Sequence, residues 1–409
     1  MDSGSGGSGP LSGITVLDLS RVLAGPWATQ GLADLGAEVI KVERPGAGDD
    51  TRHWGPPFAV QTDGQQGDAA YFFAANRGKR SVTVDIARPE GADIVRRLAA
   101  KADVVVENFK VGGLKKYGLD YPSLAALNPR LVYCSITGFG QTGPDAGRAG
   151  YDYMIQAMGG LMSITGEPGR PPVKVGVAVA DLFAGLYASN AILAALLHAK
   201  ATGEGQHIDI ALFEAQAAML ANQASNWFVS GDVPQRLGAA HPNLAPYQPL
   251  PTQDGALVVA VGNDGQFQAL CRALEAPDLG SDPRFATNAD RVGHRDQLTR
   301  ALEALTAPRT TRELIAALEA AGVPCGRVNT IAEVFAEPQA QARALVVEQA
   351  RGDLDGPVRT VASPMRLSKT PVSYGAPPPA LGADTERVLM QALGLSGDEI
   401  VRLKGQGVI

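Results

Sequence analysis

Short apolar segments alternate with helix-forming stretches through the first part of this chain, and this alternation restricts the folds available to it. The segments are rich in valine, isoleucine and leucine, as expected of buried strands: Ile14–Leu19, Glu38–Val42, Ser81–Asp85, Val104–Val106 and Leu131–Ile136. Helices are predicted from about Trp27 to Leu35, after a turn at Ala24–Pro26, and from Pro89 to Leu98. Such alternation forms βαβ units, so the first ~150 residues predict a Rossmann-like domain with a mostly parallel sheet.

The later part of the chain predicts an extension of that domain and a second, smaller one. A long helix from Asp181 to about Ala201 comes before a strand at His207–Leu212. Glycines and prolines crowd the segment after Ser225, which indicates a crossover. The further elements that we expect are helices at Phe213–Leu220, Phe267–Leu274, Arg295–Leu305 and near Asp384–Leu393, and a strand at Ala256–Val261. We therefore predict an α/β protein with a large domain of residues 11–220 and 330–409 and a small α/β domain of residues 225–329.

Composition excludes several classes of protein. A hydrophobic fraction of 45% with 19% charged residues is ordinary for a globular enzyme. The net charge of −6, with both signs mixed, gives no nucleic-acid footprint. The longest apolar stretches, such as Ala191–Leu197, are shorter than the ~20 residues of a membrane span. Residues 1–10 lack the features of a signal peptide and are expected to be a flexible linker or tag. Three widely spaced cysteines (Cys134, Cys271 and Cys325) fit a reducing compartment, so we expect a cytoplasmic protein.

Two motif-based functions find little support in the residues. Gly138–Gly143 reads GFGQTG, a formal GxGxxG after a strand, but Pro144 and Asp145 follow it where a dinucleotide site needs a helix. A plain glycine-rich loop is the better interpretation. The chain has no GxSxG elbow, and its five histidines show no metal spacing, so no metal site is predicted.

Asp181 stands between two apolar segments, VGVAVA and LFAGLY. One interpretation is that it caps the N-terminus of the helix that follows, which stabilises a helix by about 1 kcal/mol. The other is that it is a carboxylate nucleophile, kept ionised by the helix N-terminus in apolar surroundings. The residues alone leave both interpretations open.

An ordered set of motifs resembles the class III (CaiB/BaiF-type) CoA-transferases along the chain from Leu11 onward. The motifs are Gly13–Leu19, Ala24–Pro26, Asp34–Pro45, Asn76–Ser81, Val106–Phe109, Gly150–Asp152, the segment around Asp181 and Gly322–Gly326. Within the family, the segments Arg21–Thr29, Glu43–Arg52, Trp54–Phe58 and Tyr133–Gly143 are most similar to the branch of succinate–hydroxymethylglutarate (glutarate) CoA-transferase. The resemblance implies that Asp181 carries CoA from an acyl-CoA, such as succinyl-CoA, to a dicarboxylic acid through an aspartyl-CoA thioester. It also implies an interlocked homodimer, with the CoA thioester as substrate and no permanently bound cofactor.

The resemblance assigns further residues to CoA binding. It places the backbone of Leu23 and Ala24 along CoA and Arg44 at the nucleotide end, where a planar guanidinium suits phosphates. The other positions carried over are Val84, Asn108, Phe109, Lys110 and Lys116, the last in place of an arginine. Ala87 replaces a basic residue of the family, so that contact is not expected.

The residue type at position 151, a tyrosine in this chain, distinguishes the transferases from the related racemases. The related acyl-CoA racemases have a histidine at this position, and a phenol is a poor replacement for imidazole in proton transfer near neutral pH. The sequence therefore departs from the racemase pattern, and an acyl-CoA racemase or epimerase is the alternative function. A CoA-binding protein without turnover is a second alternative. For Tyr151 itself we expect a role at the active site, and aromatic packing in the core is the other interpretation. Candidates for the cation that holds a remote carboxylate are Arg52, Arg148 and Arg236, and Gly138–Gly143 and His241–Tyr247 are candidate oxyanion donors.

Overall fold

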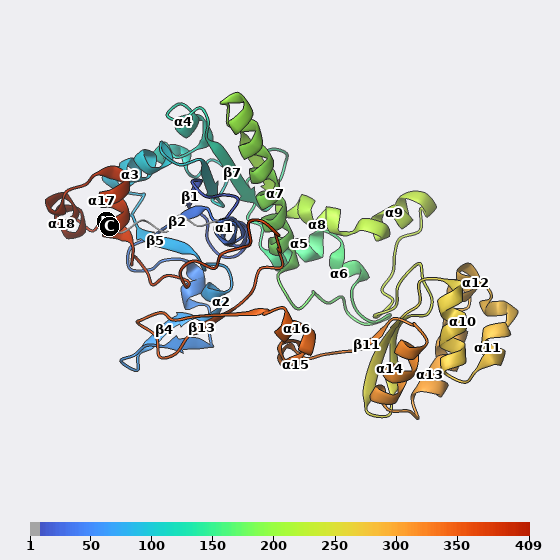
Figure 1. Cartoon of the computed structure of the whole chain (residues 1–409). Coiled ribbons are helices and arrows are strands. Elements are labelled where there is room, and N and C mark those ends of the chain that lie inside the picture. Colours follow the sequence, from blue (N-terminus) through green and yellow to red (C-terminus); the bar gives the residue numbers. More distant parts are fainter. Residues whose placement is uncertain (1–8) are drawn as a thin grey trace. The chain divides into compact units, whose positions relative to one another are not determined.

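The computed structural model describes residues 9–409 and divides the chain into two compact units (Figure 1). The first unit comprises the chain up to Gly159, Gly176–Met219 and Gln341–Ile409, and the second comprises Gly160–Val175 and Leu220–Ala340. The flexible segment predicted at residues 1–10 falls mostly on residues 1–8, which lie outside the described residues. Of its last two residues, Gly9 packs against the backbone of Leu35 and Gly36.

A six-stranded parallel sheet forms the centre of the first unit. Its strands are β1 (Thr15–Asp18), β2 (Glu38–Glu43), β5 (Lys79–Thr83), β6 (Val104–Glu107), β7 (Val132–Thr137) and β8 (His207–Ala211). They lie in the order β5-β2-β1-β6-β7-β8, and every neighbouring pair is parallel. The expected α/β fold with a Rossmann-like sheet is thereby confirmed. The strand order reverses between β1 and β6, and ligands of such sheets bind at the carboxyl ends of the strands near this switch point.

Alternating side chains of the strands feed two hydrophobic cores, one on each face of the sheet. Leu17, Ile40, Val82 and Val105 point into the core shared with α3 (Pro89–Ala99), α17 (Thr385–Leu393) and α18 (Gly397–Gly405). Val16, Val39, Val104 and Val132 point into the core shared with α1 (Ala24–Asp34), α7 (Val179–Thr202) and α8 (Leu212–Met219). Strands that are buried on both faces read as continuous apolar runs, which explains why the sequence pattern identified them.

Helix α7 is the longest element, with 24 residues and a mean hydropathy of 1.6 over its most apolar window. By length and composition it is the one helix of the described residues that could cross a membrane, although Ser189, Asn190 and His198 interrupt its apolar runs. One row of residues, all alanines except one isoleucine, packs into the core of the first unit: Ala180, Ala184, Ala188, Ile192, Ala195 and Ala199. These residues recur every three or four positions and bring α7 close to α1, β7 and β8.

Shorter elements complete the first unit. They are η1 (Asp50–His53), β3 (Phe58–Val60), β4 (Gln66–Ala69), α2 (Ala70–Phe73), η2 (Lys115–Tyr117), α4 (Tyr121–Ala125), α5 (Asp152–Met158), β12 (Val346–Gln349) and β13 (Val358–Val361). α16 (Pro338–Ala342) lies where the chain returns to this unit. The two-stranded pairs β3–β4 and β12–β13 are antiparallel.

The second unit is built on a three-stranded antiparallel sheet in the order β11-β10-β9. Its elements are α6 (Leu161–Ile164), α9 (Ala221–Ser230), β9 (Tyr247–Thr252), β10 (Gly255–Ala260), α10 (Asp264–Ala273), α11 (Pro277–Ser281), η3 (Pro283–Phe285), α12 (Asn288–Gly293), α13 (Arg295–Thr306), α14 (Thr311–Ala320), β11 (Cys325–Arg327) and α15 (Ile331–Ala336). A separate hydrophobic core, which includes Leu250, Leu257 and Phe267, holds it together.

The structure differs from the sequence-based expectations at several boundaries. Residues 160–175 and 330–340 belong to the second unit, although the predicted boundaries placed them in the large domain. Ala24–Pro26 forms the first turn of α1 and is not a turn before it. Pro26 is tolerated there because an N–H in the first helical turn has no partner within the helix. The helices α9 and α18 were not expected.

Candidate active site

Asp181 is the third residue of helix α7 and does not cap it. The N-cap position is Ala178, and no N-cap side chain satisfies the first turn. Instead, Oδ1 of Asp152 accepts hydrogen bonds from the backbone N–H groups of Ala180 (2.8 Å) and Asp181 (3.4 Å). The capping interpretation of Asp181 was therefore wrong, because a carboxylate distant in sequence takes this role and leaves the Asp181 side chain free for another.

Asp152, which our sequence reasoning did not single out as a functional residue, is the first residue of α5 and is fixed from two directions. The side-chain amide of Gln156, one turn later on α5, donates a hydrogen bond of 2.7 Å to its Oδ2. The loop before α5 folds back closely, because a Cβ on Gly138 would lie only 2.5 Å from Cα of Gly150. The motif Gly150–Asp152 was a signal that could have identified this carboxylate.

The two carboxylates make the site electrostatically unusual. Burial, and then the neighbouring negative charge of Asp152, raise the pKa of Asp181 from 3.8 to about 7. No described residue donates a hydrogen bond to the Asp181 carboxylate. Burial and the charges of Asp181, Asp152 and Asp49 also raise the pKa of Tyr71 on α2, so this phenol lies near both carboxylates. A carboxylate without partners and with a pKa near neutrality marks a candidate nucleophile.

Asp181 lies one helical turn before the residues of α7 that pack against helix α1. Asp181, Gly185 and Ser189 lie at intervals of four residues, so they share one face of α7. On this face a Cβ on Gly185 would lie 2.6 Å from the carbonyl oxygen of Ala24, and the Ser189 hydroxyl donates to the carbonyl of Ala28 at 3.3 Å. Glycine at position 185 therefore permits the close packing of α7 on the Ala24 carbonyl, and Asp181 lies one turn earlier on α7.

Most of the residues predicted to bind CoA follow the carboxyl ends of adjacent strands. Leu23 and Ala24, both buried, are the N-cap and first residue of α1 after β1. The residues that follow the next strands are Arg44 after β2, Val84 after β5, and Asn108, Phe109 and Lys110 after β6. In parallel sheets these ends meet at one edge, which is the edge where ligands bind.

The predicted side chains differ in how much they expose. Arg44, Lys110 and Lys116 are exposed, and the Lys116 ammonium lies 4.7 Å from the ring centre of Tyr117. Val84 is buried. The Asn108 amide is occupied by the backbone of Arg21, because its Oδ1 accepts from the N–H at 2.9 Å and its Nδ2 donates to the carbonyl at 2.6 Å.

Tyr151 is the N-cap residue of α5, directly before Asp152, and the residue is 68% exposed.

A cavity of about 630 Å³ opens beside Pro45, Gly46 and Thr83, the neighbours of Arg44 and Val84. Arg387 and Lys404 also line it. In the part of the chain that the structure describes, no three histidine, cysteine or acidic side chains are placed to hold a metal ion.

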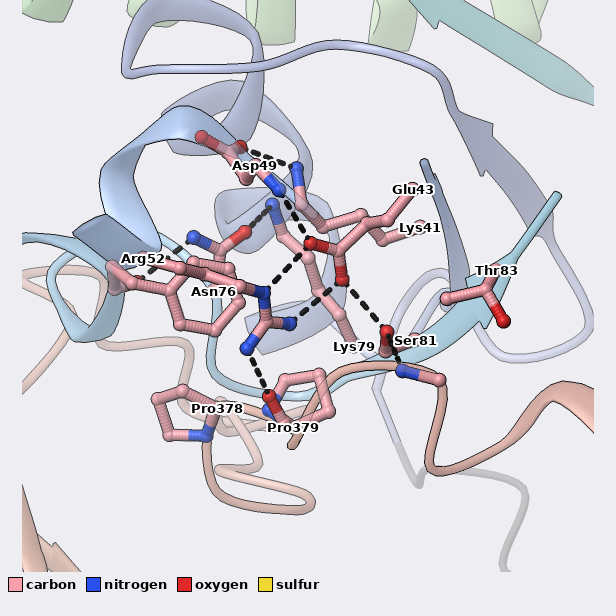
Figure 2. Close-up of polar contacts among 12 residues, drawn as sticks. Lys41, Glu43, Asp49, Arg52, Asn76, Lys79, Ser81, Thr83, Pro378 and Pro379 are labelled. Atoms are coloured by element: carbon pink, nitrogen blue, oxygen red, sulfur yellow. Dashed lines mark hydrogen bonds and ion pairs between the residues drawn. The ribbon is translucent and has the colours of Figure 1, made fainter. Parts of the chain in front are cut away.

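Arg52 was a candidate for the cation that holds a substrate carboxylate, but its guanidinium is not available for this role. It is buried, and it donates to Glu43 at 2.8 and 2.7 Å, to Asp68 at 3.0 Å and to the Pro379 carbonyl at 3.1 Å. Figure 2 shows its guanidinium turned toward Glu43 and Pro379. Arg148 pairs with Asp145 at 3.0 Å and stays about half exposed.

Arg236 was the remaining candidate for the remote cation, and the loop Gly138–Gly143 was a candidate for the oxyanion donors. In the second unit, Arg236 donates to the carbonyl of Arg170 at 2.9 Å. Within Gly138–Gly143, the N–H groups of Gly140 and Gln141 are taken by Thr137 and Asp209, so these two groups are not available for an oxyanion.

Comparisons with known proteins agree along nearly the whole chain. The model of CoA-transferase family III matches residues 11–385. Over 382 residues, the chain is 55% identical to succinate–glutarate CoA-transferase of Agrobacterium fabrum, covering 93% of this chain and 95% of that protein. It is 44% identical over 400 residues to succinyl-CoA:glutarate CoA-transferase of Homo sapiens, covering 98% and 90%. The crystal structure of a CAIB/BAIF family protein from Brucella suis has a TM-score of 0.84 at 52% identity and covers 94% of this chain and 99% of that one.

Proposed function

Because the chain belongs to CoA-transferase family III, we propose that it transfers CoA from succinyl-CoA to a dicarboxylate, with glutarate as the acceptor. The names of the relatives from Agrobacterium fabrum and Homo sapiens support this pair of substrates. The observation that carries the proposal is Asp181, a carboxylate with a pKa near 7 that lies one turn of α7 before Gly185, the residue that packs against the Ala24 carbonyl.

The first half of the proposed reaction forms a covalent enzyme. An Oδ atom of Asp181 attacks the thioester carbon of succinyl-CoA, and the C–S bond breaks, giving a succinyl-aspartyl anhydride and the CoA thiolate. The thiolate then attacks the side-chain carbonyl of Asp181, so that an aspartyl-CoA thioester forms and succinate leaves. Ionised Asp181 is required for the first attack, and the neighbouring charge of Asp152 disfavours an anion at this position and thus favours the neutral acyl forms.

The second half runs the same steps in reverse order with the acceptor. A carboxylate oxygen of glutarate attacks the aspartyl thioester, the CoA thiolate leaves, and a glutaryl-aspartyl anhydride forms. The thiolate attacks the glutaryl carbon, which releases glutaryl-CoA and the Asp181 carboxylate. No step needs a metal, flavin or nicotinamide, because the energy of the thioester bond is conserved.

We propose that the substrates bind at the edge of the parallel sheet formed by the carboxyl ends of its strands. CoA would run past Leu23 and Ala24, with Arg44 and Val84 toward the nucleotide, near the cavity beside Pro45. The remaining proposed contacts are Asn108, Phe109, Lys110, Lys116 and Tyr151. The exposed ammonium groups among them are free to reach the phosphates of CoA.

We also propose that the enzyme is a cytoplasmic homodimer. The side of α7 opposite its buried row exposes large apolar residues, and neighbouring helices add others: Phe183, Leu186, Tyr187 and Leu197 on α7, Tyr153 and Met158 on α5, and Phe213 on α8. A helix that is apolar on all sides needs cover for its outer face. Sedimentation velocity tests the homodimer, since a monomer at micromolar concentration would rule it out.

The cytoplasmic location is supported by the cysteines. All three are free thiols, as expected of a protein in a reducing compartment.

The experiment that tests the activity compares the unaltered chain with Asp181→Ala. Each is mixed with succinyl-CoA and, in turn, glutarate and other dicarboxylates, and new acyl-CoA species are separated and identified by mass spectrometry. The proposal expects glutaryl-CoA from the unaltered chain only. Deuterium uptake at the α-carbon of a branched acyl-CoA, with no transfer to any acid, would instead identify a racemase.

A further inference from the structure

We propose that Asp49 is a positioning residue for the transferase reaction, because it holds Val22 in a left-handed backbone conformation and so fixes the start of α1 against Gly185, one helical turn from Asp181. The inference rests on the proposed function, in which Leu23 and Ala24, the residues that follow Val22, lie along the acyl-CoA. Val22 has a φ of 71°, a region that β-branched residues avoid. Such a backbone persists only where the surrounding structure imposes it.

The contacts of Asp49 provide this constraint. Both oxygens of its carboxylate accept the N–H of Val22, at 3.2 and 3.3 Å, and in the described part of the chain no other group does so. The carboxylate is itself fixed by the Lys41 ammonium at 2.8 Å and by the N–H and hydroxyl of Thr51 at 3.0 and 2.8 Å. The side chains of Lys41 and Asp49 are both fully buried. Asp49 cannot turn away from Val22 without depriving the buried Lys41 ammonium group of its ion-pair partner, which is costly.

Other side chains hold the backbone on both sides of Val22 but leave its own conformation to Asp49. Lys41 donates to the carbonyl of Ser20 at 2.9 Å, and Asn108 holds both backbone groups of Arg21. Lys79 donates to the carbonyl of Pro26 at 3.0 Å. Lys41 and Lys79 belong to the buried cluster in Figure 2, which draws Lys41 bonded to Asp49 and Lys79 bonded to Asn76.

The position of the turn explains why its conformation matters for the reaction. Ala24 begins α1 two residues after Val22, and its carbonyl lies against Gly185, one helical turn from Asp181. If Val22 relaxes to a negative φ, the chain that follows it changes direction before Ala24. A displacement of about 1 Å in reacting groups can reduce the rate by about two orders of magnitude.

The test combines Asp49→Asn with Val22→Gly. Asparagine keeps the shape of Asp49, but in either orientation its amide NH₂ faces another donor, either Lys41 or the Thr51 and Val22 N–H groups. Glycine adopts a positive φ without assistance. We expect Asp49→Asn to raise KM for succinyl-CoA and lower kcat, each by roughly tenfold or more. Val22→Gly alone should stay within about threefold of the unaltered enzyme, and Val22→Gly/Asp49→Asn should recover to nearly the level of Val22→Gly.

Asp68→Asn is the matched control. Asp68 is a carboxylate of the same buried network, bound to Arg52 and Arg351, and it does not contact the turn. We expect this variant to lose thermal stability but to keep its KM for succinyl-CoA. If the double variant is folded and remains as impaired as Asp49→Asn, Asp49 does not act through Val22 and the proposal is wrong.

A separate readout distinguishes failure of this inference from failure of the proposed function. Hydrogen exchange of the amides of residues 22–25 and of Trp27 should accelerate in Asp49→Asn and return toward the Val22→Gly level in the double variant. This result does not depend on which acyl group is transferred. If the unaltered chain transfers no CoA, the proposed function fails, whereas unchanged exchange in Asp49→Asn refutes the positioning role.

Discussion

Replacing Asp181 by asparagine should stabilise the folded chain at and above neutral pH. Asparagine has nearly the same shape but no charge, so it removes an ionised group that the folded site disfavours. Burial and the charge of Asp152 raise the pKa of Asp181 from 3.8 to about 7 in the folded chain. Because the folded state then binds the proton more tightly than the unfolded state, ionisation of Asp181 lowers the free energy of unfolding.

The size and the pH window of this effect follow from the two pKa values. The difference between 3.8 and about 7 corresponds to roughly 4 kcal/mol, which is an upper limit. Asp181 is only partly buried, and the N-terminus of α7 favours its anion, so we expect about 1–3 kcal/mol. The destabilisation is absent below about pH 4, grows as the pH rises, and is complete above about pH 7.

Urea unfolding of the unaltered chain and Asp181→Asn between pH 4.5 and 8.5 measures this difference. The exposed Asp232 provides a control, because Asp232→Asn removes a carboxylate that water solvates in both states. We expect the stability gain of Asp181→Asn to increase with pH, whereas Asp232→Asn should differ from the unaltered chain by a small, constant amount. A gain that is equal at all pH values, or a loss of stability at pH 8, would refute the electrostatic account of the site.

Three further predictions concern the same site. Since the first attack requires ionised Asp181, kcat/KM for succinyl-CoA should rise with pH with a midpoint near 7, and a flat profile between pH 6 and 8 would contradict this. Asp152→Asn removes the neighbouring charge but keeps an oxygen for the Ala180 N–H, so it should move that midpoint to lower pH in the same rate measurement. Gly185→Ala places a Cβ about 2.6 Å from the Ala24 carbonyl, so calorimetry should show a loss of about 1–3 kcal/mol and turnover should fall at least tenfold.

The sequence predicted the parallel sheet and the long helix because their signals are local. Strands buried on both faces, such as Val104–Glu107, give continuous apolar runs, and α7 contains a long run of alanine and leucine. The predicted start of α1 at about Trp27 was wrong because glycine and proline usually interrupt helices, whereas the first helical turn tolerates both. Local signals also could not show that residues 160–175 join the second unit.

The site was predictable only where one residue carries the signal. Asp181 stands out as a lone charge between apolar segments, but its cap comes from Asp152, and that contact joins parts of the chain that are distant in sequence. Arg52 looked available for a substrate because its partners Glu43 and Asp68 become neighbours only in the folded chain. The positive φ of Val22 has no sequence signal, since valine rarely adopts it.

The covalent role of Asp181 is the central claim, and mass spectrometry of the enzyme with bound intermediate tests it most directly. The unaltered chain is incubated with succinyl-CoA without an acceptor, quenched in acid and digested, and the peptides are mapped. We expect CoA joined through a thioester to the peptide that contains Asp181, and we expect this adduct to disappear when glutarate is added. Transfer of CoA by Asp181→Ala at the rate of the unaltered chain, or an adduct on another residue, would contradict it.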